Sequence, residues 1–158
     1  MEQAYPYLPK GRTILYVSED HPLMQEAARA RQELSTDSAH PTGAVIVLNG
    51  AVLGSGANQS VFKNKMLRNL HKSGFCIRRL LKVPSGTRYW LCPGCASSQS
   101  HGEIQAVRDA LSKNASLKGA DLYLCGHWWC CKSCWDVMIA AGIKNVYLVE
   151  GATEKFSR

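Results

Sequence analysis

Apolar residues recur along the chain at two spacings, which predict strands and helices. An apolar run at residues 13–17 is of strand length, and a capping Asp20 shortly before a proline begins a helical pattern that continues to residue 34. Residues 43–56 contain two β-branched runs joined by Asn49-Gly50, the pair best suited to the positive φ angles of a two-residue hairpin turn. The first third of the chain therefore predicts a strand, a helix and a β-hairpin.

The last third of the chain alternates helices with strands. Helical spacing at residues 101–113 is followed by a buried strand at 122–125, and a second helix at 131–141 ends at Gly142 before a last strand at 145–149. A strand, a helix of this length and a further strand favour a right-handed crossover with parallel strands. We therefore expect an α/β fold with a mixed sheet whose last two strands are parallel.

The segment at about residues 60–100 is expected to be an insertion between the hairpin and the next helix. It contains a basic amphipathic stretch at 66–81 and a turn at Pro84-Ser85-Gly86. Its basic residues contribute +8, and the rest of the chain contributes 11 minus 12, or −1, to the net charge of +7. Such a segment attracts phosphate-bearing ligands, either nucleotides or polynucleotides, or forms an ordinary solvated face. The eight basic residues are Lys63, Lys65, Arg68, Lys72, Arg78, Arg79, Lys82 and Arg88.

Composition narrows the class of protein. A chain of 158 residues that is 46% hydrophobic forms one ordinary globular domain. No apolar run reaches the length of a membrane span, and the first ten residues lack a basic segment leading into an apolar stretch, so we expect a cytoplasmic protein that does not enter membranes. Seven cysteines in a reducing compartment indicate metal or redox chemistry rather than a disulfide framework.

Two short motifs lie where the chain enters predicted helices. His101 and Glu103 open one helix, and Cys131 and Cys134 open the next. Two cysteines three residues apart in a first helical turn lie on one face, and with an imidazole they can hold one Zn²⁺. Two thiolates and a neutral histidine leave the fourth zinc position to water, which is typical of catalytic zinc, and Glu103 is then the candidate proton carrier.

These motifs, in this order, resemble the zinc-dependent cytidine and deoxycytidylate deaminase superfamily, and most of all its deoxycytidylate deaminase branch. The resemblance is carried by HPLMQEAARAR, GAVIVLNGAVLGSGAN, HGEIQAV and CKSCWDVMIAAGIKNVYL, and spans roughly residues 21–150. It implies a three-layer α/β/α fold, a single deaminase domain over residues 1–158, and hydrolysis of an amino-pyrimidine nucleotide, with dCMP the leading substrate. It also implies a homo-oligomer, for which the helix face at Trp135 to Ile139 is a candidate.

The resemblance assigns roles to individual residues. It implies that His101, Cys131 and Cys134 bind the catalytic zinc and that Glu103 moves protons from water to the base and to the leaving ammonia. Asn58, which follows the hairpin, resembles the family's sugar-contacting asparagine.

The loop before the second cysteine motif is the expected pocket wall. His127, Trp128 and Trp129 are candidates for contact with the substrate base, although core packing is equally expected for at least one of the tryptophans. Cys130 stands where the family nearly always has proline, which leaves a spare thiol beside the zinc and implies either an altered geometry or an oxidisable site.

Cysteines of the insertion suggest a second metal site. Cys92 and Cys95, with His71 or Cys76, are expected either to bind a second, structural zinc, as some deoxycytidylate deaminases do, or to be thiols without metal. In a rival arrangement the two Cys-x-x-Cys pairs form one structural Cys₄ ribbon, which leaves the histidine and glutamate motif unexplained. A redox pair of the thioredoxin type is disfavoured, because neither pair follows the first strand of that fold.

Two alternative functions remain open at this point. One is a deaminase that acts on a base in single-stranded DNA or transfer RNA, since the basic segment fits a strand as well as one phosphate. The other is a zinc-stabilised nucleic-acid-binding protein without catalysis, which keeps the metal and the basic segment but releases no ammonia.

Overall fold

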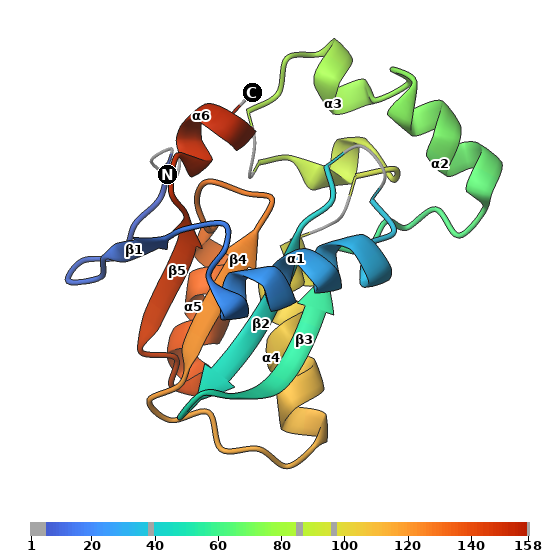
Figure 1. Cartoon of the computed structure of the whole chain (residues 1–158). Coiled ribbons are helices and arrows are strands. Elements are labelled where there is room, and N and C mark those ends of the chain that lie inside the picture. Colours follow the sequence, from blue (N-terminus) through green and yellow to red (C-terminus); the bar gives the residue numbers. More distant parts are fainter. Residues whose placement is uncertain (1–5, 38–39, 85–86, 96–97, 158) are drawn as a thin grey trace.

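A mixed five-stranded sheet lies between two helical layers in the computed structural model, which describes residues 6–37, 40–84, 87–95 and 98–157 (Figure 1). The strand order is β1-β5-β4-β2-β3, with β1, β5 and β4 parallel and β2 antiparallel to both β4 and β3. This confirms the expected α/β class and the parallel last two strands. The strands are β1 (Ile14–Val17), β2 (Gly43–Leu48), β3 (Ala51–Ala57), β4 (Asp121–Cys125) and β5 (Asn145–Val149).

Helices cover both faces of the sheet. They are α1 (Pro22–Leu34), α2 (Lys65–Lys72), α3 (Ile77–Leu80), α4 (Gly102–Ser112), α5 (Lys132–Ala141) and α6 (Ala152–Phe156), with 3₁₀ turns η1 (Tyr89–Leu91) and η2 (Ser98–Ser100). Helix α1 packs on one face, whereas α4 and α5 lie side by side on the other (Figure 1). None of the helices in the described ranges is long and apolar enough to cross a bilayer.

Strand β2 has apolar side chains on both faces because both faces are covered. Val45 and Val47 point into the core beneath α1, and the alternating Ala44 and Ile46 point into the core beneath α4 and α5. Trp135 and Met138 belong to that second core, so the helix face expected to serve an assembly leaves mainly Ile139 exposed. Assembly of several copies therefore stays a prediction.

The hairpin turn has the conformation that its sequence predicts. Asn49 and Gly50 have φ angles of 51° and 80°, as a type I′ turn requires. The pairing register shifts between Ile46 and Val47, an irregularity that the sequence did not signal. Helix α1 is capped by His21, whose Nδ1 accepts the backbone N–H of Leu23 at 3.2 Å, rather than by the expected Asp20.

The insertion lies beyond one end of the strands, where α2 and α3 lead away from the core (Figure 1). The amphipathic stretch at 66–81 is two helices rather than one, because the chain turns at Gly74 with a φ of 124°. The expected turn at Pro84-Ser85-Gly86 includes residues 85–86, which lie outside the described residues. Helix α6 follows β5 and was not predicted.

Helix α4 packs directly on the backbone of β3, and this contact generates a stability prediction. A Cβ added at Gly56 would lie 2.2 Å from the backbone nitrogen of Ala106, so strand and helix would have to separate. We expect Gly56→Ala to lower the free energy of unfolding by about 1–3 kcal/mol in urea denaturation. The exposed Val52→Ala on the same strand is the control and should cost less than about 1 kcal/mol; equal losses would contradict the close-packing argument.

Candidate metal centre and active site

The starts of α4 and α5 bring one histidine and two cysteines together. His101 directly precedes α4, Cys131 directly precedes α5, and Cys134 lies in the first turn of α5. The Nδ1 atom of His101 is 3.5 Å from the Sγ of Cys131 and 3.4 Å from the Sγ of Cys134, and the two sulfurs are 3.3 Å apart. The three ligand atoms therefore form a compact triangle at adjacent helix N-termini.

This triangle has the size of a zinc site. Bonds of about 2.3 Å to sulfur and about 2.0 Å to nitrogen at tetrahedral angles separate two sulfurs by about 3.8 Å and a sulfur from a nitrogen by about 3.5 Å. The two sulfur–nitrogen separations match closely, and the sulfur–sulfur separation is shorter by about half an ångström. All three ligand atoms come together as one group that could hold a metal ion.

The electrostatics favour thiolate at this triangle. The hydrogen bond with Cys134, aided by His101 and Ser133 and opposed by burial, lowers the pKa of Cys131 to about 3. The same sulfur–sulfur contact and burial raise the pKa of Cys134 well above its usual value. Two sulfurs that share one proton in this way are suited to a divalent cation that displaces the proton.

Glu103 is buried in the first turn of α4, beside the triangle. Burial raises the pKa of Glu103, against the opposing charge of His101. The thiol of Cys130, which is fully buried, donates a hydrogen bond to this carboxylate. Burial and the charge of Glu103 raise the pKa of Cys130. This enclosed thiol is a partner of Glu103 that sequence reasoning missed.

A family model decides the class of this site. The chain matches the cytidine and deoxycytidylate deaminase zinc-binding region over residues 17–150. The chain belongs to this deaminase family. The expected enzyme class, a zinc-dependent hydrolytic deaminase, and the expected cofactor, Zn²⁺, are thereby confirmed, whereas the deoxycytidylate branch stays a prediction.

Solved deaminases of three kinds are similar to this deaminase. It is 20% identical to the dCMP deaminase of cyanophage S-TIM5 over 85% of this chain and 86% of that one, with a TM-score of 0.48. It is 20% identical to guanine deaminase from Bacillus subtilis over 85% of this chain and 68% of that one, with a TM-score of 0.46. No curated protein matches the sequence.

The third similar structure belongs to a longer protein. It is the Thermotoga maritima diaminohydroxyphosphoribosylaminopyrimidine deaminase/5-amino-6-(5-phosphoribosylamino)uracil reductase, to which the chain is 22% identical with a TM-score of 0.47. The match covers 80% of this deaminase but 28% of that protein.

Residues expected to contact the substrate differ in their exposure in this deaminase. Trp129 is only 4% exposed and packs in the core, whereas Trp128 and His127 are half-buried in the loop before α5. The Nδ1 of His127 accepts the backbone N–H of Trp129 at 3.3 Å. His127 and Trp128 are therefore the better placed of the three for contact with a base, which stays a prediction.

Asn58 is buried and holds a loop together in the deaminase. Its Oδ1 accepts hydrogen bonds from the backbone N–H of Thr42 at 2.9 Å and the hydroxyl of Ser35 at 2.6 Å. Its Nδ2 donates to the carbonyl of His40 at 2.8 Å and to the carboxylate of Asp37 at 3.4 Å. A sugar hydroxyl would have to share or displace one of these bonds, so the predicted sugar contact has a competing structural role.

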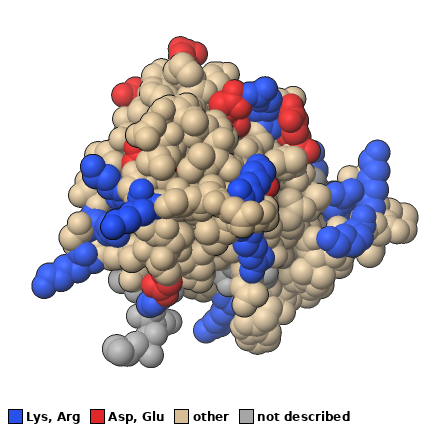
Figure 2. All heavy atoms as spheres, turned by 90° about the horizontal axis from the view of Figure 1, so that it is seen from below, with Lys and Arg blue, Asp and Glu red and all other residues tan. Residues whose placement is uncertain are grey.

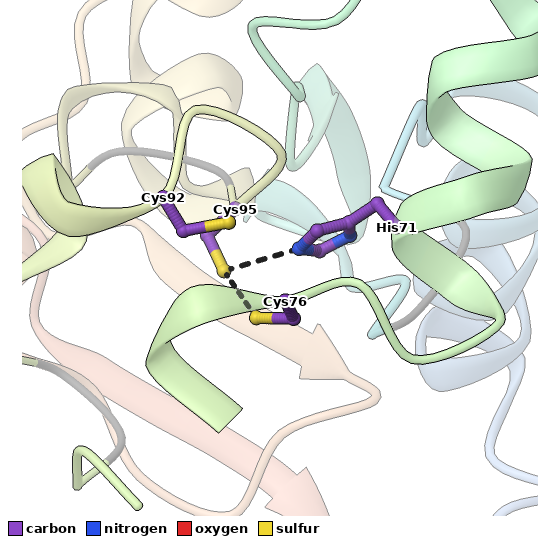
Figure 3. Close-up of side chains that lie close together, drawn as sticks. All are labelled: His71, Cys76, Cys92 and Cys95. Carbon is purple, nitrogen blue, oxygen red and sulfur yellow. Dashed lines mark hydrogen bonds between the residues drawn. The ribbon is translucent and has the colours of Figure 1, made fainter. Parts of the chain in front are cut away.

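The insertion gathers a second set of ligands, in which the side chains of His71, Cys76, Cys92 and Cys95 point toward one another (Figure 3). The Sγ of Cys95 is 3.6 Å from the Sγ of Cys76 and 3.5 Å from the Nε2 of His71, again the separations of a tetrahedral zinc site. The two Cys-x-x-Cys pairs lie in different groups, so the Cys₄ ribbon arrangement is wrong.

The basic segment of this deaminase is only partly a surface feature. Figure 2 shows Lys and Arg side chains gathered at the right-hand edge, on the side where α2 lies in Figure 1, with others scattered over the face. Arg78 is buried, Arg68 is half-buried and the other six basic residues are exposed.

The half-buried His127 generates a prediction about pH. Burial, aided by the charge of His101, lowers the pKa of His127 from 6.5 to about 4. Between these values the unfolded chain binds a proton that the folded chain does not, so the free energy of unfolding falls as the pH is lowered from about 6.5 to about 4. We expect His127→Asn, which keeps an acceptor for the Trp129 N–H, to flatten this dependence in urea unfolding between about pH 7 and about pH 5. An unchanged slope would contradict the shift.

Proposed function

We propose that this deaminase hydrolyses the exocyclic amino group of a pyrimidine nucleotide, with dCMP the leading substrate, at a site in which His101, Cys131 and Cys134 hold zinc. The observation that carries the proposal is the triangle of ligand atoms with buried Glu103 beside it. Two thiolates and a neutral imidazole balance the charge of Zn²⁺ and leave the fourth position to water. When bound, zinc supplies a Lewis acid that lowers the pKa of this water toward neutrality.

Glu103 performs the proton transfers in this mechanism. Its raised pKa suits a group that must both accept and donate protons near neutral pH. It takes a proton from the attacking water, whose oxygen bonds to C4 of the ring, and gives this proton to the ring nitrogen. It then moves the remaining proton of that oxygen to the amine, and the bond between C4 and the amine breaks to release ammonia and leave a keto group. The thiol of Cys130 holds the carboxylate during these steps, at the position where the family nearly always has proline.

The position of the insertion supports a phosphate-bearing substrate. Tyr89 of the insertion lies against His101 with ring centroids 5.0 Å apart, so the basic segment begins at the edge of the site. One or two cations suffice for a nucleotide monophosphate, whereas a single strand requires a row of them. The exposed basic residues also fit the alternative, a deaminase of single-stranded DNA or transfer RNA. The salt dependence of substrate affinity distinguishes the two, because affinity for a strand falls steeply with ionic strength.

We further propose that the insertion cluster of His71, Cys76, Cys92 and Cys95 binds a structural zinc. Between residues 61 and 95, the buried residues that the structure describes are these four, Arg78 and Gly94. The described part of the insertion thus has no aliphatic core, and a bound metal holds the segment together in place of one. The cytoplasm suits both sites, because its reducing environment keeps thiols available for metal.

The buried guanidinium of Arg78 supports the proposal that the insertion cluster binds a metal ion. Three thiolates, one neutral histidine and Zn²⁺ carry a formal charge of −1. The Nη1 of Arg78 lies 3.5 Å from the Sγ of Cys95 and supplies the compensating charge. A buried arginine is costly without such a partner, and a buried complex of charge −1 is costly without the arginine.

Replacing the proton carrier tests the catalytic proposal. We expect Glu103→Gln to reduce ammonia release from dCMP by about 10²- to 10⁴-fold while zinc content stays the same. The exposed Glu150→Gln is the matched control and should keep full activity. A panel of dCMP, cytidine, single-stranded DNA and transfer RNA, at low and moderate salt, identifies the substrate class. If the wild type releases no ammonia from any of these substrates, the result would favour the non-catalytic, zinc-stabilised nucleic-acid-binding protein instead.

Metal analysis tests the structural zinc. We expect two zinc ions per chain in the wild type, one in Cys95→Ser, and two in Cys125→Ser, which removes a buried cysteine outside both clusters. Trypsin should cut the insertion of Cys95→Ser faster, because the exposed lysines and arginines lose the ordered backbone around them. Two zinc ions per chain in Cys95→Ser would contradict the proposed structural zinc.

A further inference from the structure

The buried Arg78 connects the insertion cluster to the loop that precedes η1. Besides its contact with Cys95, its Nε donates to the carbonyl of Thr87 at 3.0 Å and its Nη2 donates to the carbonyl of Pro84 at 3.0 Å. The planar guanidinium therefore fixes a cluster sulfur and two backbone positions at once, which a point charge cannot do.

Tyr89 continues this connection to the proposed catalytic zinc site. The Cζ of Arg78 lies 4.2 Å from the centre of the Tyr89 ring, on its face. The same ring meets the ring of His101 at 5.0 Å and 81°, an edge-to-face contact. Tyr89 thus contacts both the arginine of the insertion cluster and the histidine at the start of α4.

His101 has an unusual need for such a contact. A histidine that binds metal through one nitrogen commonly has its ring fixed by a hydrogen bond from the other nitrogen to a carboxylate or a carbonyl. In His101 the Nδ1 faces the two sulfurs, and no hydrogen bond to Nε2 is found among the residues that the structure describes. The residue also makes no side-chain capping bond to α4. Among the residues that the structure describes, the edge-to-face contact with Tyr89 therefore orients the imidazole from outside the ligand triangle.

We propose that Arg78 and Tyr89 are positioning residues that transmit the order of the insertion cluster to His101, so that metal in the insertion tightens the hold on the catalytic zinc. This inference rests on the proposed function in two respects, the role of His101 as a zinc ligand and the binding of a structural zinc by the insertion cluster. It concerns the lifetime of bound metal rather than turnover, so it is measured without substrate.

The experiment is the release of zinc from the two-zinc protein to an excess of a colorimetric chelator. The phase that belongs to the His101 site is identified as the one missing in Cys134→Ser. We expect Tyr89→Leu to speed this phase by about tenfold and to leave the other phase unchanged, because loss of an orienting partner weakens a metal site by about 10- to 100-fold. Tyr89→Phe, which keeps the ring, should release zinc at the wild-type rate.

Matched variants separate positioning from general damage. Trp90→Leu removes the neighbouring aromatic ring of η1, which is 81% exposed, and should change neither phase. Cys95→Ser, which removes the insertion metal, should speed release from the His101 site. Arg78→Lys keeps the positive charge but loses the planar guanidinium, so it should also speed zinc release from the His101 site. If circular dichroism shows that Tyr89→Leu does not fold, Arg78→Lys replaces it as the test.

The outcomes decide the inference separately from the proposed function. Release from the His101 site at the wild-type rate in Tyr89→Leu, or in Cys95→Ser, would overturn the coupling. Equally fast release in Tyr89→Phe and Tyr89→Leu would overturn the role of the ring. If the variants release zinc at the expected rates but the wild type frees no ammonia, the proposed function is refuted and the coupling stands. If the wild type is an active deaminase but the variants release zinc at the wild-type rate, the coupling alone is refuted.

Discussion

Helix α4 meets β3 backbone to backbone, and the position of the active site follows from this contact. Gly54 and Gly56 have no side chains to hold the helix away, and a Cβ on either would lie less than 3 Å from backbone atoms of α4. The start of α5 is fixed independently by the parallel β4 and β5 that flank it. Two helix N-termini are thus held side by side, each with a positive end that favours thiolate and carboxylate groups. The zinc triangle needs no ligand from a flexible loop.

The two cysteine clusters differ in charge, and the difference explains their surroundings. The cluster between α4 and α5 offers two cysteines, so a complex of their thiolates with Zn²⁺ would be neutral and could face a substrate without a counter-ion. The insertion cluster offers three cysteines, so a complex of their thiolates with Zn²⁺ would be an anion, and the guanidinium of Arg78 lies against the Sγ of Cys95. The ring of Tyr89 contacts both Arg78 and His101, so the proposed neutral site and the proposed charge-compensated site would lie next to each other.

The sequence predicted those parts of the structure that local chemistry decides. The Asn49-Gly50 turn, the helices that begin at the zinc motifs and the parallel last two strands follow from turn preference, periodicity and connection length. The membership of the insertion cluster was open between His71 and Cys76, and the structure includes both. The spacing alone could not choose, because the chain must first turn at Gly74.

Other features depend on contacts between distant residues, which no local pattern contains. The hydrogen bonds of Asn58 reach back to the loop after α1, and its motif indicated a sugar contact instead. The thiol of Cys130 was noticed only as a departure from proline, and its bond to Glu103 appears only in the folded chain. Burial of Arg78 could not be read from a run of cations that otherwise looks solvated.

An insertion whose described interior consists of one histidine, three cysteines, one arginine and one glycine has consequences for how the protein can change. Its apolar residues, among them Leu70, Phe75 and Trp90, lie on the outside and contribute little to holding it together. The buried cluster of the insertion is separate from the two cores that cover the sheet. The segment beside the active site is therefore free to acquire new surfaces, and with them new substrates or partners, without loss of the fold that carries the chemistry.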